Sequence, residues 1–207
     1  MVNDMDLYKY ENELYNQGVN YIGGVDEVGR GPLIGPVVTA CVVLPKNFIL
    51  DGLTDSKKLS EKKRNLFYNY IINNCIAYSV GIVEAYEIDR INIYEATKKA
   101  MIMAIDEVKS KVNLEHVLID AMPLDISIPT TSIIKGDAKS ISIAAASVVA
   151  KVTRDKMMYD LDNKYPQYGF GKHKGYPTKA HIEAIQKYGL IEGYRKTYGP
   201  VKEVLNK

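Results

Sequence analysis

Short apolar runs alternate with longer segments of helical periodicity along this chain. Five of the short runs are interpreted as strands, and the second is dense in β-branched residues, which fit a pleated and buried surface. These runs are YIGGV (21–25), GPVVTACVVL (35–44), IAYSVGIVE (76–84), HVLID (116–120) and TTSIIKGD (130–137). We expect the third strand to lie antiparallel to the second.

Apolar residues at helical spacing predict helices over 6–17, 94–112, 140–161 and 178–188. A further helix is predicted to begin after Ser60, which serves as its N-cap. The methionines of the 94–112 helix recur with alanines on one face, which indicates core side chains and no ligand set. Residues 164–181 are expected to form a loop and residues 193–205 a short tail. The order β, β, β, α, β, β, α, with helices on both faces, predicts a three-layer α/β domain with a mixed sheet of five strands.

Length and composition indicate a globular protein with one sizeable core, because the chain has 207 residues and 46% hydrophobic residues. No apolar run approaches the roughly 20 residues of a membrane span. The acidic and polar residues 1–15 do not resemble a signal peptide or a basic transit sequence. Cys41 and Cys75 suit a reducing cytoplasm as buried thiols, although a disulfide between them stays open.

The net charge of +2 hides a division along the chain. Residues 1–134 carry 13 Lys and Arg against 18 Asp and Glu, whereas residues 135–207 carry 14 against 7. The second part also holds 7 of the 16 tyrosines. A basic, tyrosine-rich region attracts a phosphate backbone and sugar faces, although any single lysine in it can equally be a solvated surface residue.

Carboxylates stand at the ends of three predicted strands: Asp26 with Glu27, Asp120, and Asp137. Ligands of open α/β sheets collect where strand ends converge, so these side chains are expected to share a pocket. Like charges so close repel one another unless divalent cations lie among them. Oxygen ligands favour Mg²⁺ or Mn²⁺ over zinc, and two such ions make a site that cleaves phosphodiesters. A single aspartate at a strand end is more often a turn or cap residue, so the inference depends on the set.

Two loops add groups that could bind an anion. In DEVGRG (26–31), the glycines let the backbone approach a ligand, and Arg30 between them can face an anion. A tight turn with a solvated arginine is the alternative. In DSKK (55–58), Lys57 and Lys58 could grip phosphates, although a plain solvated loop fits these residues as well.

Other chemistries lack their residues. The sequence contains no G-x-x-x-x-G-K-[ST], and its glycines at 29, 31 and 35 do not make G-x-G-x-x-G. Neither C-x-x-C nor H-E-x-x-H occurs, and three histidines give no evident zinc cluster. Ser147 lies in an alanine-rich segment without the setting of a nucleophile elbow.

The motifs VDEVGRGPLIGPVV, DSKKLS, LIDAM, KGDAKSISIAAASVVAKVTRD and YGFGKHKGYPT occur in this order and closely resemble type 2 ribonuclease H, the ribonuclease HII family. The similarity spans roughly residues 21–200. It implies an RNase H-like fold with a small helical C-terminal region and an endoribonuclease that uses Mg²⁺ or Mn²⁺. The implied activities are hydrolysis of the RNA strand of RNA–DNA hybrids and nicking of duplex DNA 5′ of an embedded ribonucleotide, with 5′-phosphate and 3′-hydroxyl ends.

The resemblance also implies roles for individual residues. The family's four acidic metal ligands, which hold two ions, fall on Asp26, Glu27, Asp120 and Asp137. Its GRG motif, which senses the 2′-hydroxyl largely through backbone groups, falls on Gly29, Arg30 and Gly31. The tyrosine that stacks on the sugar next to the ribonucleotide falls on Tyr176, and Lys174 beside it offers a phosphate contact.

Two other aspartates are set aside: Asp125 as a loop residue, and Asp155 as a member of a structural ion pair in the long helix. We divide the chain into an RNase H-like catalytic domain (1–159) and a basic, tyrosine-rich substrate-binding region (160–207) of the same compact unit. We expect a cytoplasmic monomer that acts in ribonucleotide excision and RNA primer removal.

Two alternatives are weighed against this interpretation. A type 3 ribonuclease H shares the catalytic core and acts on hybrids, but it carries an N-terminal sheet domain, whereas about 20 residues precede the first strand here. A non-catalytic nucleic-acid-binding protein would use the basic region but would not require four carboxylates at strand ends.

Overall fold

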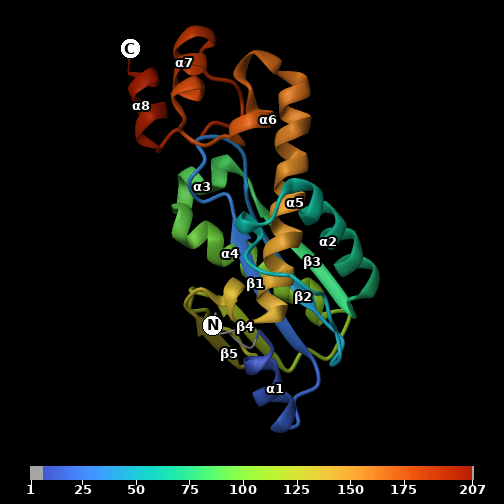
Figure 1. The fold of residues 1–207 in the computed structure, drawn as a ribbon. Coiled ribbons are helices and arrows are strands. Elements are labelled where there is room, and N and C mark those ends of the chain that lie inside the picture. Colours follow the sequence, from blue (N-terminus) through green and yellow to red (C-terminus); the bar gives the residue numbers. More distant parts are fainter. Residues whose placement is uncertain (1–6, 207) are drawn as a thin grey trace.

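The computed structural model describes residues 7–206 and shows a mixed five-stranded sheet with helices on both faces (Figure 1), as predicted. The strands are β1 (Ile22–Val28), β2 (Val37–Val43), β3 (Ala77–Val83), β4 (His116–Asp120) and β5 (Thr130–Ile133). Their order in the sheet is β3-β2-β1-β4-β5. β2 pairs antiparallel with β1 and β3, and β4 pairs parallel with β1 and β5. The central strand β1 therefore ends at the same edge as β4.

Helices form the two outer layers. They are α1 (Lys9–Asn16), α2 (Glu61–Asn74), α3 (Ala85–Ile91), α4 (Ile93–Lys109), α5 (Ile141–Lys164), α6 (Phe170–His173), α7 (Lys179–Tyr188) and α8 (Gly199–Leu205). Single 3-10 turns are η1 (Ser56–Lys58), η2 (Gly136–Ala138) and η3 (Pro166–Tyr168). α2 and α5 pack on one face of the sheet and α4 on the other. α6, α7 and α8 gather around the far end of α5 (Figure 1).

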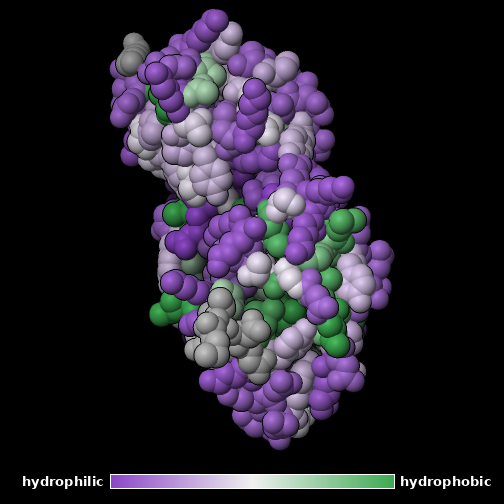
Figure 2. Space-filling view, viewed as in Figure 1, coloured by the Kyte–Doolittle hydropathy of each residue, from purple (hydrophilic) through white to green (hydrophobic). Residues whose placement is uncertain are grey.

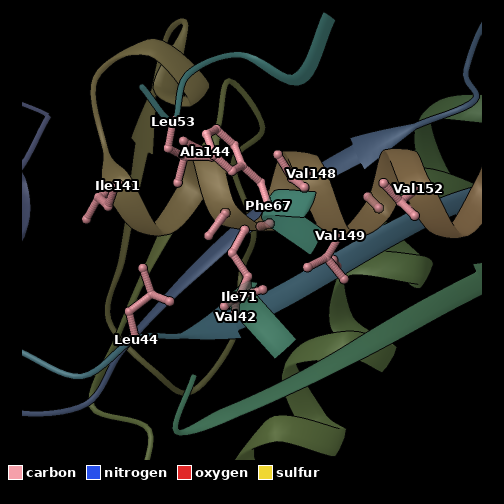
Figure 3. Close-up of a cluster of buried hydrophobic side chains, with 14 of the residues drawn as sticks. Val42, Leu44, Leu53, Phe67, Ile71, Ile141, Ala144, Val148, Val149 and Val152 are labelled. Carbon is pink, nitrogen blue, oxygen red and sulfur yellow. The ribbon is translucent and has the colours of Figure 1, made fainter. Parts of the chain in front are cut away.

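Small side chains allow α5 to lie directly on the sheet. Figure 3 shows the apolar cluster between α5, α2 and β2, which includes Ala144, Val148, Phe67, Ile71 and Val42. On β1, a Cβ atom at Gly24 would lie 2.1 Å from the carbonyl carbon of Ser142. Only glycine fits this contact, which holds the start of α5 against the middle of β1, two residues before Asp26.

Two strand boundaries differ from the predictions and bear on the acidic residues. β1 continues through Asp26 and Glu27, so this pair lies inside the strand and not after it. β5 ends at Ile133, and the left-handed backbone of Lys135 (φ 58°) turns the chain into η2. Asp137 therefore belongs to a 3-10 turn and not to a strand end, because pairing with β4 stops before it.

The helical predictions also need corrections. Asn92 (φ 70°) ends α3 and caps α4, so the helix expected over 94–112 begins at Ile93 and α3 was missed. Met101 is buried, but Met103 is 45% exposed, so the prediction that the methionines are core side chains holds for Met101 alone. α6 and α8 fall in the predicted loop and tail, because helices this short leave little periodicity to detect. Ser60 caps α2 as expected. α1 is shorter than 6–17, of which residue 6 lies outside the described residues.

The C-terminal region has a small core of aromatic rings. Tyr168 stacks on Phe170 with ring centroids 5.2 Å apart, and His173 stacks on His181 at 4.3 Å. Ile34, from the loop after β1, is fully buried in this core and bridges to the C-terminal region. α5 runs unbroken past residue 159 into the region. The two parts therefore share a helix and a core.

Both cysteines are free thiols, with Cys41 buried in β2 and Cys75 half-buried after α2. Burial raises the pKa of Cys41 to about 12, so this thiol stays protonated at neutral pH. Over residues 7–206, no helix combines the length and the hydropathy that a membrane crossing requires.

The buried His181 predicts a loss of stability in mild acid. Its Nδ1 and Nε2 lie 2.9 and 2.8 Å from the Tyr176 carbonyl and the Tyr194 hydroxyl. Burial lowers the pKa of His181 from 6.5 to about 4. Between these values the unfolded chain binds a proton on this residue and the folded protein does not. The free energy of unfolding should therefore decrease as the pH falls through this window, by up to roughly 3 kcal/mol.

Urea denaturation at pH 7 and at pH 4.5 measures this loss. A His181→Gln variant should be less stable at pH 7 but should lose less stability between the two pH values. An equal loss in the variant and in the wild type would assign the acid sensitivity to other groups.

Candidate active site

The edge of the sheet at which β1 and β4 end carries two of the acidic residues singled out in the sequence. Val25 of β1 lies opposite Ile119 of β4 in parallel register, so the residues that follow, Asp26 and Asp120, are neighbours at this edge. Side chains alternate along a strand, so Asp26 faces α5 whereas Glu27 points to the opposite face. The sheet topology thus places two carboxylates side by side.

Asp137 joins them to form a carboxylate triad (Asp26, Asp120 and Asp137). One carboxylate oxygen from each residue lies within 4.8 Å of the others. Asp26 and Asp137 are buried, and Asp120 is half-buried. The Asp120 Oδ1 accepts a hydrogen bond of 2.7 Å from the Gly136 amide, which holds η2 against the end of β4. The turn after β5 therefore contributes the third carboxylate.

Negative charge is crowded in the triad. Burial raises the pKa of Asp26 well above its usual range, and the charges of Glu27 and Asp120 raise it further. Burial also raises the pKa of Asp137, and Asp55 and Asp120 add to the effect. In the described part of the chain, no lysine or arginine forms an ion pair with the triad. The raised pKa values mean that these carboxyl groups tend to keep their protons when no cation is present. An all-oxygen donor set of this kind fits a hard divalent cation, which would take the place of those protons.

Glu27 lies beside the triad rather than within it. Its Oε1 is 3.6 Å from the Arg30 Nη1, an ion pair in which Arg30 is the more exposed partner. Burial raises the pKa of Glu27. The positive charge of Arg30 lowers this pKa, and the negative charge of Asp120 raises it further. Glu27 thus interacts with the triad but has a counter-ion of its own.

The loop before α2 brings a further carboxylate and a lysine to the triad. The Asp55 carboxylate accepts a hydrogen bond of 2.9 Å from the Lys57 amide at the start of η1. The same carboxylate raises the pKa of Asp137. Burial disfavours the charge on Lys57, but Asp26, Asp55 and Asp137 outweigh it and raise its pKa. The sequence pointed to the lysines of this loop but not to Asp55, because no periodicity marks a loop residue. Lys58 is exposed.

The loop between β1 and β2, residues 29–36, is here called the glycine loop. Gly29 has φ 97°, and a Cβ atom there would lie 2.4 Å from the Arg154 Nε. A Cβ atom at Gly31 would lie 3.2 Å from the Cε1 of the Tyr176 ring. Gly29 is therefore required by its close contact and its left-handed backbone, whereas a side chain at Gly31 would crowd the Tyr176 ring. Tyr176 thus lies against the loop despite its distance in sequence.

Tyr176 is partly exposed and is held by its backbone. Its amide donates to the His173 carbonyl (2.9 Å), and its own carbonyl contacts the His181 Nδ1. Tyr176 is 39% exposed, so part of the residue is open to a ligand. Lys174 is engaged within the protein, since its ammonium group donates to the Gly171 carbonyl and lies 3.6 Å from the centroid of the Tyr159 ring.

Two buried arginines bind the glycine loop, a role that was not predicted from the sequence. Arg154 of α5 and Arg195 are both fully buried. Arg154 donates to the carbonyls of Ile34 (3.1 Å), Pro36 (3.0 Å) and Lys174 (2.9 Å). An arginine within an apolar helix was the available signal for Arg154. Arg195 follows the last predicted helix in a segment without periodicity, so no signal marked it.

Asp155 and Asp125, the two aspartates that were not assigned to the metal site, do not belong to the cluster of carboxylates that forms the triad. Asp155 is buried in α5 and pairs with Lys151 (2.7 Å) and Arg64 (3.8 Å), which confirms the expected structural ion pair. Asp125 is exposed in the loop between β4 and β5.

Comparisons with known proteins agree with this geometry. The family described as Ribonuclease HII matches residues 23–198. The ribonuclease HII of Bacillus cytotoxicus is 59% identical over 201 residues, which cover 97% of this chain and 77% of that protein. The ribonuclease H2 structure from Pyrococcus horikoshii has a TM-score of 0.76 at 26% identity and covers 90% of this chain and 97% of that chain. Bst-RNase HIII in complex with Mn²⁺ has a TM-score of 0.68 at 17% identity, over 91% of this chain and 70% of that chain, which shows a likeness of fold alone.

Replacing Asp26 by asparagine should stabilise the metal-free protein at neutral pH. The folded-state pKa of Asp26 is raised, so the ionised carboxylate opposes folding above that pKa, and a neutral amide removes the repulsion. We expect the free energy of unfolding in EDTA to increase by about 0.5–2 kcal/mol, the range of single stabilising substitutions. Urea denaturation at pH 8 measures it.

The exposed Asp125→Asn is the matched control and should change stability little. The gain from Asp26→Asn should shrink when Mg²⁺ or Mn²⁺ replaces EDTA, because the cation neutralises the same charges. If Asp26→Asn destabilised the metal-free protein, the Asp26 carboxylate would be stabilised by a positive partner, and the crowding of negative charge would not be the dominant effect.

Proposed function

This chain belongs to the ribonuclease HII family, and from that premise we propose that the carboxylate triad and Glu27 are its catalytic metal site. The family assigns the chain type 2 ribonuclease H activity, that of a metal-dependent endoribonuclease. The observation that carries the residue assignment is the convergence of three carboxylates, two buried and one half-buried, at one edge of the sheet.

We propose Mg²⁺ or Mn²⁺ as the ions, bound as a pair. The all-oxygen donors support this choice, and the related Bst-RNase HIII structure contains Mn²⁺. Bound there, two ions would activate a water molecule and stabilise charge on the leaving 3′ oxygen. Asp26, Asp120, Asp137 and Glu27 would hold them, and the ion pair of Glu27 with Arg30 would orient its carboxylate.

The histidines of the chain are occupied elsewhere, which leaves proton transfer to water and the carboxylates. His116 contacts the Thr131 hydroxyl at 2.8 Å, at the start of β4 and far along the strand from Asp120. His173 and His181 stack on each other in the C-terminal core. We therefore assign no histidine a catalytic role.

The proposed substrates are the RNA strand of RNA–DNA hybrids and duplex DNA with an embedded ribonucleotide, nicked on its 5′ side to leave 3′-hydroxyl and 5′-phosphate ends. The 2′-hydroxyl is the group that separates a ribonucleotide from its deoxy counterpart. Gly29, Arg30 and Gly31 would read it through their backbone groups beside the metal site. The Tyr176 ring, which lies against Gly31, would stack on the adjacent sugar.

The basic C-terminal region, residues 160–207, would bind the phosphate backbone. Its visible face in Figure 2 is largely hydrophilic, and residues 160–207 carry 9 Lys and Arg against 5 Asp and Glu. Asp26 and Asp137 of the triad raise the pKa of Lys57, so this lysine lies near the triad. It is therefore the best placed lysine to bind a phosphate next to the scissile bond. The exposed Lys58, and Lys174 once released from its internal contacts, are further candidates. The free thiols support our proposal of a cytoplasmic enzyme, which we further propose to be a monomer.

Asp120→Asn should nearly abolish cleavage without unfolding the protein. Loss of a metal-holding carboxylate should decrease kcat by at least about 100-fold, more than the loss of a residue that only orients a ligand. The measurement is cleavage of a duplex with one ribonucleotide in Mg²⁺ and in Mn²⁺, with EDTA as the blank. Cleavage that persists in EDTA would remove the metal from the mechanism.

Asp155→Asn is the control for Asp120→Asn, because Asp155 is likewise an aspartate on the α5 side of the sheet and is itself buried. It should retain most of the rate per folded molecule and should lose about 1–3 kcal/mol of stability, because Lys151 and Arg64 lose a charged partner. If Asp155→Asn were inactive and as stable as the wild type, the choice of Asp137 over Asp155 would be wrong.

Tyr176→Ala should impair cleavage at a single embedded ribonucleotide more than cleavage of an all-RNA strand. Only the first substrate presents a deoxyribose on the 3′ side for the ring to stack on. Stacking of roughly 1–3 kcal/mol corresponds to about 5- to 150-fold in kcat/KM. Tyr176→Phe keeps the ring and should lose less. Equal activity of Tyr176→Ala and the wild type on both substrates would leave Tyr176 as a packing residue of its loop.

A further inference from the structure

Among residues 7–206, no carboxylate forms an ion pair with the buried guanidinium group of Arg195. This is unusual because burying a charge is costly unless it is paired. In the described residues it binds backbone carbonyls of the glycine loop instead. Its Nη2 lies 2.6 Å from the Gly29 oxygen and 2.8 Å from the Gly35 oxygen, and its Nη1 lies 3.0 Å from the Arg30 oxygen. Tyr198 donates a second hydrogen bond, 2.7 Å long, to the Arg30 carbonyl.

These bonds fix the direction of two amide groups. A trans peptide is planar, so its N–H points opposite to its C=O. The Gly29 carbonyl is turned inward to Arg195, so the Arg30 N–H of the same peptide points outward. The Arg30 carbonyl is also turned inward, so the Gly31 N–H points outward as well. Neither N–H has an acceptor within residues 7–206.

The segment that carries Arg195 is itself anchored to the catalytic part of the chain. The Asp89 carboxylate of α3 accepts hydrogen bonds from the amides of Lys196 (2.8 Å) and Thr197 (2.9 Å) and from the Thr197 hydroxyl (2.6 Å). The Arg195 amide donates to the Leu33 carbonyl (2.8 Å). Arg195 is thus held from both sides, and the amides that it directs have little freedom to rotate.

We propose that Arg195, supported by Tyr198, is a positioning residue for ribonucleotide recognition: it aims the Arg30 and Gly31 amides at the 2′-hydroxyl oxygen. The inference rests on the proposed role of the glycine loop and explains how an arginine remote in sequence makes that loop a rigid reader. Because the guanidinium fork carries five N–H donors, it can hold three carbonyls at once, whereas a lysine ammonium cannot match this planar geometry.

The test is the binding ratio of two duplexes. Fluorescence anisotropy in EDTA gives Kd for a DNA duplex with one ribonucleotide and for the all-deoxy duplex of the same sequence. Without divalent ions no strand is cut, and the ratio of Kd values isolates the contact to the 2′-hydroxyl. A general folding defect affects both duplexes alike and cancels in the ratio.

Tyr198→Phe removes one hydroxyl from the Arg30 carbonyl and should decrease this discrimination by about 3-fold, and Arg195→Lys by about 10-fold, as expected for one and for several weakened hydrogen bonds. Tyr168→Phe is the matched control. Its hydroxyl also donates to backbone carbonyls of the C-terminal region, at 3.2 and 2.9 Å, but these belong to Tyr188 and Gly189 and not to the glycine loop. The control should keep the wild-type ratio.

Wild-type discrimination in both Tyr198→Phe and Arg195→Lys would overturn the proposal. If Arg195→Lys does not fold, Tyr198→Phe decides alone. A wild-type ratio close to one would instead refute the backbone recognition of the 2′-hydroxyl from which the inference starts. Reduced discrimination in both variants with an unchanged control would establish Arg195 as the residue that aims the two amides.

Discussion

Crowding of negative charge at one edge of the sheet is the constraint on which the rest of this structure depends. Three carboxylates lie within 4.8 Å of one another, and two of them are buried. Water cannot screen charges in that position, so the carboxylates either retain protons or require cations. The surrounding structure must hold them rigidly in this unfavourable arrangement. Gly24 does so by letting α5 contact β1, and the Gly136 amide does so by binding Asp120.

The glycine loop connects this charged edge to the C-terminal region. Its side chains enter the aromatic core through Ile34, and its carbonyls turn toward Arg154 and Arg195. Each guanidinium donates to several carbonyl oxygens and, within residues 7–206, forms no ion pair with a carboxylate, and burial lowers the pKa of both arginines. The arrangement costs desolvation but holds the backbone of the loop by hydrogen bonds to the carbonyls of Gly29, Arg30, Ile34, Gly35 and Pro36. Such rigidity suits a loop that must recognise a single hydroxyl group, because little entropy is then lost on binding.

Much of the fold follows from the sequence, because its elements carry local signals. Alternating or continuous apolar runs marked all five strands, and the Ser60 cap and the alanine-rich face located α2 and α5. The errors share one physical origin. β1 extends past its apolar run because β2 continues to pair with Asp26 and Glu27, and α6 and α8 exist because tertiary contacts bury their few apolar residues. Pairing and packing of this kind leave no periodic pattern in the sequence.

The sequence by itself also predicted the chemical class of the site, because four acidic residues near strand ends favour an oxygen-rich site for divalent cations. Only the tertiary structure decided which of these carboxylates lie close together. Asp137, from a turn, completes the triad with Asp26 and Asp120. The alternation of side chains along β1 directs Glu27 to the other face of the sheet. Asp55, Arg154 and Arg195 escaped prediction for the same reason. Their roles depend on neighbours about 80 to 170 residues away in the chain, such as Gly29 for Arg195, and no local pattern encodes such contacts.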